Sequence, residues 1–271
     1  MEEAMNIVVC VKQILDPDLP PAKFKVDPKS KQVIPPEGIP LVMNPYDEQA
    51  VELALRLKEK NGGKITALSL GAQEALSAIK HTLSLGADDG IALWDEAFAH
   101  SDSFSVAYIL SRAIQKIGGY DLVLCGRQAA DWDEGLTGPI LAQQLGIPVI
   151  NLVKNIEPAD GKWRFTRVIA GGEQAFAVSL PALATITNEA PQPRLPTGWG
   201  IISANRKQIP VWNAQDIGAD LAQVGSHAAR RQLIGLTIPE RKRNCEIIDG
   251  ENTAQAADKL GRRLNELGAL L

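Results

Sequence analysis

Short apolar segments alternate with helical patterns over the first half of the chain, and this alternation most constrains the fold. Strands are predicted at residues 6–12, 64–70, 90–94 and 121–124, and helices between them at 44–60, 73–85 and 102–117. Nearly continuous apolar, β-branched runs are typical of strands buried on both faces of a parallel sheet. The order predicts an α/β fold with a doubly wound, mainly parallel sheet, in which residues 6–12 form the central strand.

Local signals mark where several of these elements begin. Asn44 is a candidate N-cap, Pro45 suits the first helical position, and Asp47 and Glu48 lie in the first turn, where acidic residues are favoured. A hairpin is predicted within residues 23–39, and a further helical pattern begins at residue 140.

The pattern changes after residue 149. Strand-like segments follow at residues 149–153, 163–170, 175–180 and 182–187, and they predict an antiparallel extension of the sheet. Residues 189–243 are rich in proline and glycine and lack periodicity, which indicates an extended arm. Residues 252–271 have apolar residues near helical spacing, and this amphipathic helix is expected either to dock on its own domain or to bind a partner subunit. We therefore divide the chain into an α/β domain, residues 1–190, and an arm, residues 191–271.

Composition limits the classes of function. The formal charge is −4 and the pI about 5.5, and Arg241, Lys242 and Arg243 form the one basic cluster, so nucleic-acid binding is not expected. A mean hydropathy of −0.06 with no long apolar run is unlike a membrane protein. The three cysteines are scattered, and the N-terminus lacks the pattern of a secretory signal or transit peptide. A reducing, cytoplasmic location is expected.

Signatures of catalysis are absent. The sequence contains no G-x-G-x-x-G, P-loop or G-x-S-x-G motif, and no nucleophile or carboxylate constellation recurs near the three histidines. Asp131, Asp133 and Glu134 lack the spacing of a calcium loop, so a solvated acidic loop is favoured over a metal site. We expect neither a catalytic residue nor a metal ligand.

The loop that follows residues 121–124 has the character of a nucleotide-binding turn. It offers Gly126, Gly135 and Thr137 before a helix start, although an ordinary strand-to-helix loop would contain the same residue types. In an open α/β sheet, such a loop lies beside the carboxyl ends of the other strands, here Cys10 and Leu70. Backbone N–H groups at that edge suit an anion attached to a purine. A nucleotide pocket is therefore predicted.

Several motifs in order resemble the β subunit of electron transfer flavoproteins. They are I7-V-V-C-V-K-Q13, M43-N-P-Y-D-E-Q-A-V-E52, L83-S-L-G-A-D88, D121-L-V-L-C-G-R-Q-A-A-D131 and G171-G-E173 leading to L180-P-A182. The resemblance covers about residues 5–187, with a weaker match in the arm. One departure inside it is Gln174, where a glutamate is usual.

The resemblance implies a heterodimer in which an α subunit holds most of a redox FAD and the arm of the β subunit wraps around α. It implies a structural AMP in the β subunit, with Thr137 at the phosphate, and places Tyr46 near the flavin of α. The implied cofactor-binding residues are Cys10, Asn44, Pro45, Tyr46, Asp47, Leu70, Gly126, Arg127, Gln128, Ala129, Ala130, Asp131, Gly135, Leu136 and Thr137. Electrons would pass from a flavin-dependent dehydrogenase of the acyl-CoA type to a membrane quinone oxidoreductase or another acceptor, so the chain would be an electron carrier subunit rather than a stand-alone catalyst.

Three departures leave alternatives open. Pro17 stands where an aromatic residue often lies near the flavin, and Leu195-Pro196 is not followed by the usual lysine-rich run of the dehydrogenase-recognition loop. Leu136-Thr137-Gly138 is similar to AMP-binding members, whereas Gly138-Pro139 is similar to a bifurcating subfamily that binds a second FAD and oxidises NADH. We favour AMP, with FAD as the alternative. A stand-alone regulatory domain of the universal-stress type is a third reading, against which the arm and the terminal helix argue.

Overall fold

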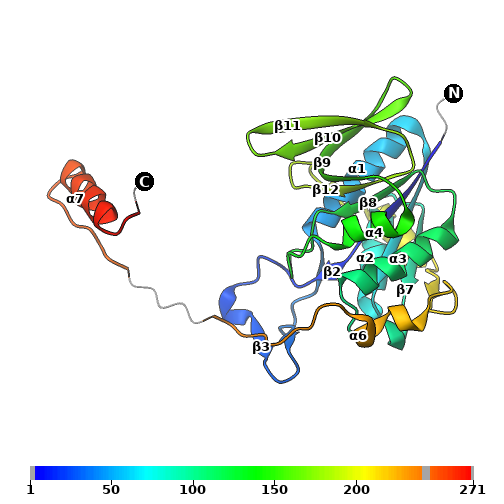
Figure 1. Cartoon of the computed structure of the whole chain (residues 1–271), viewed down its shortest axis with the longest axis horizontal. Helices are drawn as coiled ribbons and strands as arrows, with labels where there is room; N and C mark the ends of the chain where they lie inside the picture. The colour runs from blue at the N-terminus through cyan, green and yellow to red at the C-terminus, as the bar shows by residue number, and fades with distance from the viewer. Residues whose placement is uncertain (1–3, 240–244, 270–271) are drawn as a thin grey trace.

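The computed structural model describes residues 4–239 and 245–269 and contains a large, mostly parallel sheet between two layers of helices (Figure 1). The strands are β1 (Met5–Cys10), β2 (Gln13–Ile14), β3 (Lys25–Asp27), β4 (Gln32–Ile34), β5 (Val42–Met43), β6 (Gly63–Leu70), β7 (Asp89–Leu93), β8 (Leu122–Gly126), β9 (Val149–Ala159), β10 (Lys162–Ile169), β11 (Gly172–Val178), β12 (Ala182–Ile186) and β13 (Val211–Trp212). The α-helices are α1 (Pro45–Asn61), α2 (Gln73–Leu85), α3 (Ser103–Ile117), α4 (Thr137–Leu145), α5 (Gly198–Arg206), α6 (Gly225–Ala228) and α7 (Thr253–Glu266). The predicted α/β fold with a mainly parallel sheet is confirmed.

The strand order of the main sheet is β11-β10-β9-β12-β8-β1-β6-β7-β13. Strand β1 pairs in parallel with β6 on one side and with β8 on the other. Strands β6 and β7 therefore extend the sheet on one side of β1, and β8 and the strands beyond it extend the sheet on the other side. The border between β1 and β8 is the point where the strand order reverses.

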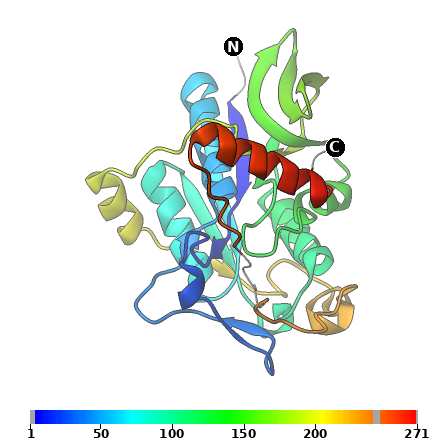
Figure 2. The ribbon, with the colours of Figure 1, turned by 90° about the vertical axis from the view of Figure 1, so that its left-hand side faces the viewer.

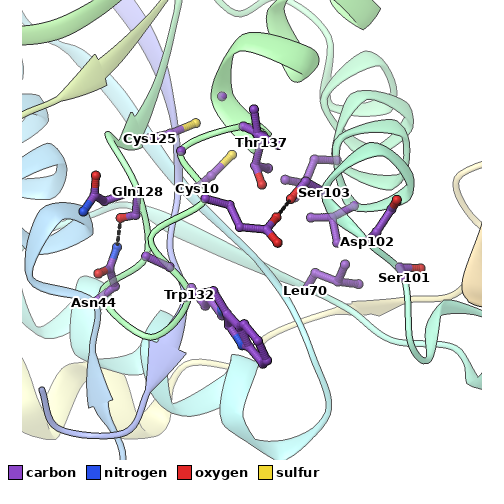
Figure 3. Close-up of a pocket in the computed structure, with 18 of the residues that line it drawn as sticks. Cys10, Asn44, Leu70, Ser101, Asp102, Ser103, Cys125, Gln128, Trp132 and Thr137 are labelled. Carbon is purple, nitrogen blue, oxygen red and sulfur yellow. Dashed lines mark hydrogen bonds between the residues drawn. The ribbon is translucent and has the colours of Figure 1, made fainter. Parts of the chain in front are cut away.

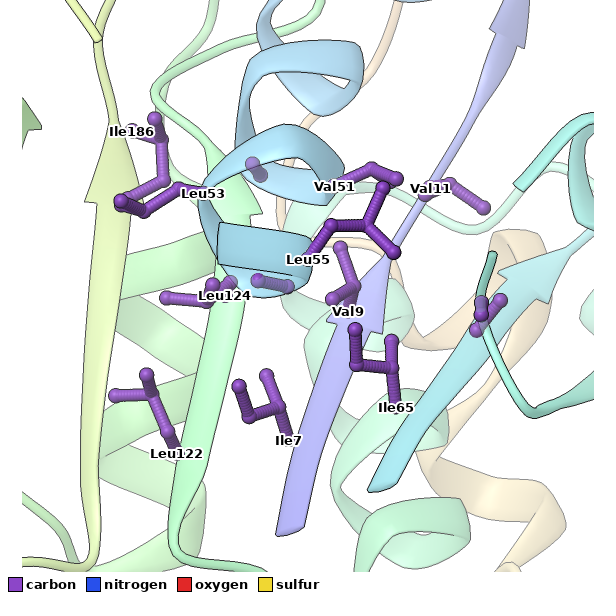
Figure 4. Packing of buried hydrophobic residues seen from close by; sticks show 14 of the residues in the cluster. Ile7, Val9, Val11, Val51, Leu53, Leu55, Ile65, Leu122, Leu124 and Ile186 are labelled. Carbon is purple, nitrogen blue, oxygen red and sulfur yellow. The ribbon is translucent and has the colours of Figure 1, made fainter. Parts of the chain in front are cut away.

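Helices cover both faces of the sheet, and two apolar clusters hold the layers together. One cluster packs α1 and α2 against one face, with Val9, Leu124 and Ile186 on the strands and Val51 and Leu55 on α1 (Figure 4). The other packs α3 and α4 against the opposite face of the same strands. Alternate residues of each central strand enter opposite clusters, which explains why these strands are apolar at almost every position.

One prediction about the sheet and one about a helix start need correction. The segment predicted as the last antiparallel strand, β12, is parallel and lies between β8 and β9. All five of its residues are buried, as expected of a strand covered on both faces. Within the nine-stranded sheet, the antiparallel pairs are those that β10 makes with its two neighbours, β9 and β11. Helix α4 begins at Thr137 rather than at residue 140, so its first turn includes Gly138 and Pro139.

Other local predictions are confirmed. Strands β3 and β4 form the antiparallel hairpin expected within residues 23–39. Pro45 is the first residue of α1, and Asn44 occupies the N-cap position. The side chain of Asn44 makes no capping hydrogen bond, because it is used elsewhere in the fold.

The segment after residue 190 contains short elements that the sequence did not predict. Helix α5 packs against α2, and β13 adds a parallel strand next to β7 at the edge of the sheet. Helix α7 lies apart from this body in Figure 1, and Figure 2 shows it in front of the body after a quarter turn. The basic cluster at residues 241–243 and the last two leucines lie outside the described residues. Within the described ranges, none of the helices combines the length and the apolar composition needed to cross a bilayer.

Candidate nucleotide site

A cavity of about 930 Å³ opens where β1 and β8 end (Figure 3). In open α/β sheets, ligands bind beyond the carboxyl ends of the strands at the point where the strand order reverses. Cys10 and Cys125, paired in register on β1 and β8, line the inner end of the cavity. The loop between β8 and α4 forms one wall.

Asn44 holds that loop in place. Its amide Nδ2 donates to the carbonyl oxygen of Gln128 at 2.9 Å, and its Oδ1 accepts from the backbone N–H of Ala130 at 3.1 Å. The side chain is 1% exposed, so both hydrogen bonds are shielded from water. Asn44 therefore shapes the cavity by joining the start of α1 to the loop, and its amide is already committed to the protein.

Asp47 joins the ends of the two central strands. Its Oδ2 accepts from the backbone N–H of Lys12 at 2.8 Å, and its Oδ1 accepts from the backbone N–H of Gly126 at 3.0 Å. Burial raises the pKa of Asp47 to about 7, although hydrogen bonds from Asn44 and from these backbone groups act in the opposite direction. The carboxyl group replaces the sheet hydrogen bonds that are lost where the strands separate to form the cavity.

The raised pKa of Asp47 predicts a pH dependence of stability. Because the pKa in the folded state, about 7, exceeds the unfolded value near 4, the folded protein holds this proton more tightly. As the pH rises from 5 to 7, wild type should lose up to about 1.4 kcal/mol of unfolding free energy per pH unit relative to Asp47→Asn. Urea unfolding at pH 5, 6, 7 and 8 measures this difference. Parallel profiles for the two proteins would contradict it.

The loop and the start of α4 present backbone groups to the cavity. A Cβ atom at Gly126 would lie 2.4 Å from Asp47 Oδ1, so the loop passes too close to α1 for any side chain there. Gly135 has a φ of +63°, which favours glycine. Helix α4 has no side-chain cap, and Pro139 has no N–H, so the N–H groups of Thr137 and Gly138 are those at the helix start that suit an anion. Figure 3 shows the Thr137 side chain directed into the cavity.

The Cys125 thiol at the inner end of the cavity is chemically quiet. A hydrogen bond with the Cys10 side chain, together with burial, raises the pKa of Cys125 well above its ordinary value. A protonated, buried thiol is a poor nucleophile. Cys125 therefore acts as a small apolar side chain in the cavity wall, and Cys10 beside it is also buried.

Most of the sequence-predicted site residues meet at this cavity. It is lined by Cys10, Asn44, Asp47, Leu70, Gly126, Arg127, Gln128, Ala129, Gly135, Leu136 and Thr137. Four predicted residues do not line it: Pro45, Tyr46, Ala130 and Asp131. Tyr46 lies under the guanidinium of Arg127, 5.1 Å from ring centroid to Cζ, and Asp131 forms an ion pair with Lys12 at 2.6 Å.

Two groups of lining residues were missed by the sequence reasoning. Residues 100–103, with Val106 and Leu110 of α3, enter from the end of β7, and residues 226–233 contribute Ser226, Ala229, Arg231, Gln232 and Leu233. The end of β7 follows the same strand-end rule that identifies Leu70, so the sequence does contain a signal for residues 100–103. No local pattern marks residues 226–233, which reach the cavity only through the tertiary fold.

The acidic residues of the loop are each engaged with other side chains. Asp133 accepts from the Gln128 amide, and Glu134 accepts from the Ser103 hydroxyl and pairs with Arg231. Among the described residues, no group of three or more His, Cys, Asp or Glu side chains is arranged to hold a metal ion. The donors that the cavity offers are backbone N–H groups, hydroxyls and cationic side chains at its rim, which suit a phosphate-bearing ligand.

Comparison with known proteins agrees with this geometry. A model of the electron transfer flavoprotein domain matches residues 33–217. An electron transfer flavoprotein subunit beta from Thermoanaerobacterium thermosaccharolyticum is 37% identical over 262 residues, which cover 96% of this chain and 98% of that protein. Subunit CarD of the caffeyl-CoA reductase-Etf complex from Acetobacterium woodii is 34% identical, covering 97% of this chain and 98% of that protein. Protein FixA from Azorhizobium caulinodans is 31% identical, covering 93% of this chain and 91% of that protein. The chain belongs to the electron transfer flavoprotein family and matches its β subunits over nearly their full length.

Proposed function

We propose that this β subunit works in a heterodimer that carries electrons from a flavin-dependent dehydrogenase to a downstream acceptor. In this proposal the electrons pass through FAD held mainly by the α subunit, and the cavity described above holds an adenine nucleotide. The observation that carries the nucleotide proposal is the convergence of Cys10, Asp47 and the 126–137 loop at the point where the strand order reverses. Flavin supplies the electron-transfer chemistry, and the protein supplies position and electrostatics.

The chain's own residues have distinct roles in this proposal. The N–H groups of Thr137 and Gly138 and the Thr137 hydroxyl hold a phosphate at the start of α4. Leu70, which is partly buried, offers an apolar wall for the base. Asn44 and Asp47 act indirectly, since their side chains are bonded to the loop and to the strand ends.

AMP is the first candidate occupant, and it would be structural. The second candidate is FAD, in a bifurcating flavoprotein that oxidises NADH, and the size of the cavity favours it. About 930 Å³ lies near the upper end of the range typical of small-molecule pockets, about 300–1,000 Å³, which suits a large ligand. Residues 100–103, Ser226, Ala229 and residues 231–233 line the cavity in addition to the predicted residues.

Cofactor content decides between the two occupants. The co-expressed α/β complex is purified, denatured, and its released AMP and FAD are quantified per heterodimer. One AMP and one FAD support the electron carrier with a structural nucleotide, whereas two FAD and no AMP support the bifurcating alternative. A complex that retains a flavin in α and no nucleotide in β would overturn the nucleotide assignment.

We expect Thr137→Ala to weaken nucleotide binding about tenfold, which corresponds to about 1.4 kcal/mol and to the loss of one hydrogen bond to a charged group. The reason is that Thr137 is the first residue of α4 and lines the cavity. Thr253→Ala is the matched control, because Thr253 is the first residue of α7, away from the cavity. Equilibrium dialysis against AMP and against FAD measures the affinity. Equal affinities for both variants would count against a phosphate at α4.

Two surfaces support the proposed protein partners. Helix α7 buries none of its residues, and Leu260 on it is 46% exposed, so an α subunit around which residues 191–271 wrap would cover an apolar face. Leu195 and Trp199 are 88% and 79% exposed and form, with Ile201 and Ile202, an apolar patch around the start of α5. We assign this patch to a dehydrogenase of the acyl-CoA type. The acceptor is a membrane quinone oxidoreductase or another electron acceptor.

A further inference from the structure

We propose that residues 229–233 form a lid over the nucleotide cavity, held closed by Asp102 and by an ion pair between Glu134 and Arg231. Ala229, Arg231, Gln232 and Leu233 line the cavity, although they are far away in sequence from the walls at the ends of β1, β6, β7 and β8. The inference rests on the proposed nucleotide binding and adds how the nucleotide is retained.

Asp102 anchors the lid and caps α3 at the same time. Its Oδ1 accepts from the backbone N–H groups of Phe104 and Ser105, both at 3.1 Å, which caps the helix. Its Oδ2 accepts from the backbone N–H groups of Arg230 at 2.7 Å and Arg231 at 3.1 Å. One oxygen serves the helix and the other serves the lid, so the two functions can be separated by mutation.

The ion pair fastens the lid to the opposite wall. Arg231 Nη1 lies 2.6 Å from Glu134 Oε1, and Glu134 is in the loop that leads into α4. Glu134 also accepts a hydrogen bond from the Ser103 hydroxyl, which Figure 3 marks across the cavity. The lid, the α3 start and the phosphate-binding loop are therefore linked through one carboxylate.

Contacts on the two sides of the lid complete its attachment. The Arg230 guanidinium lies over the Phe104 ring, 4.6 Å from its centroid. The Lys31 ammonium, at the β3–β4 hairpin, donates to the carbonyl oxygen of Leu233 at 2.9 Å. Before the lid, the backbone N–H of Gly225 donates to the Ser101 hydroxyl at 3.0 Å.

The lid is suited to opening. Residues 230–233 are all exposed, so polar contacts rather than buried apolar area hold them in place. Segments of this kind open locally at low free energy. The chain continues from the lid toward α7, the helix that we assign to the contact with the α subunit. A bound nucleotide that keeps the lid closed therefore also holds in place the point from which this segment starts. Binding of the nucleotide and of the partner is then reciprocally coupled.

Two variants test the lid. Asp102→Asn keeps one oxygen, which can still cap α3. The oxygen that binds the lid is replaced by an NH2 group, which cannot accept the hydrogen bonds from the backbone N–H groups of Arg230 and Arg231. Glu134→Gln removes the charge that pairs with Arg231. Glu157→Gln is the matched control, because Glu157 pairs with Arg164 at 3.3 Å on the β9–β10 hairpin, away from the cavity.

Dissociation of tritiated AMP, and in a separate arm of FAD followed by its fluorescence, is measured by chase from the α/β complex. We expect both lid variants to release the bound probe at least tenfold faster than wild type, with Glu157→Gln unchanged. Trypsin, which cleaves after Arg230 and Arg231, gives a second readout by intact mass. A saturating concentration of AMP or FAD should slow cleavage at these two sites in wild type. The same concentration should slow cleavage less in the two lid variants.

The outcomes separate this proposal from the proposed function. If a probe binds wild type but the lid variants release it at the wild-type rate and trypsin cleavage is not slowed, the lid is overturned and the nucleotide site stands. If neither probe binds the wild-type complex, the nucleotide site fails and the lid fails with it.

Discussion

Gly126→Ala is expected to destabilise the protein by about 1–3 kcal/mol, as overpacking of a closed site does, and to lower its nucleotide content at least tenfold. A Cβ atom at this position would lie 2.4 Å from Asp47 Oδ1 and 2.7 Å from Tyr46 Cβ. Relief of that clash requires Asp47 or the loop to move. Either movement breaks the hydrogen bond between the Gly126 N–H and Asp47 and displaces the main wall of the cavity.

Gly172→Ala is the matched control for this substitution. Gly172 begins the exposed strand β11, and a Cβ atom there would meet no other atom within 4 Å. Urea unfolding and nucleotide quantification on the same preparations give both readouts. If Gly126→Ala has the same stability and the same nucleotide content as wild type, the cavity wall adapts to the added methyl group. The close approach of the loop to α1 would then be needed neither for stability nor for nucleotide binding.

Arg194→Ala is expected to lower the free energy of unfolding by about 3 kcal/mol, because the buried carboxylate of Glu52 loses one of its two guanidinium partners. Glu52 of α1 is 2% exposed, and Arg194 Nε lies 2.8 Å from its Oε2. Arg56 also bonds Glu52, at 2.7 Å, which keeps the effect at the lower end of the usual range. Arg164→Ala, in an exposed pair with Glu157, should change stability by less than about 0.5 kcal/mol.

The pH dependence of the Arg194 effect provides an internal check. Burial alone would raise the pKa of Glu52, but hydrogen bonds from Arg194 and Arg56 outweigh it, and the pKa lies below its ordinary value. In wild type, the stabilisation from Glu52 is therefore present at neutral pH and is lost only as the pH falls through that lowered pKa. In Arg194→Ala, fewer hydrogen bonds oppose the effect of burial on the pKa of Glu52, so Glu52 takes up a proton at higher pH. The difference in unfolding free energy between wild type and Arg194→Ala should therefore become smaller from pH 7.5 toward pH 5. A difference that stays constant over this range would contradict this explanation.

Arg194, which is bonded to Glu52 and Glu59 of α1, immediately precedes the exposed patch. Arg194→Ala should slow electron transfer from an acyl-CoA-type dehydrogenase together with its loss of stability. Leu195→Ser, which changes an 88% exposed side chain, should slow that transfer without changing the unfolding curve. Stopped-flow reduction of the α/β complex by the dehydrogenase measures the rate. Unchanged rates in Leu195→Ser would remove the patch from the proposed partner surface.

Local patterns predicted the regular part of this protein well, because burial on both faces leaves a direct mark on the sequence. The apolar runs at residues 6–12 and 121–124 became β1 and β8, and Pro45 begins α1 as its fixed backbone angle predicts. The predicted antiparallel direction of β12 was wrong, since β12 pairs in parallel with β8. Its run Ala182–Ile186 is apolar at nearly every position, which is typical of a strand buried on both faces of a parallel sheet.

The α/β class, the glycines and threonine of the β8–α4 loop, and the family of the chain can all be predicted from the sequence alone. Each of these depends on residues close together in the chain or on motifs in order. The tertiary structure was needed to show that Asn44 and Asp47 are bonded to the loop and strand ends, and that Ala229 and residues 231–233 line the cavity. Hydrogen bonds between groups 80 to 130 residues apart depend on how the whole sheet is wound, and no local propensity records that winding.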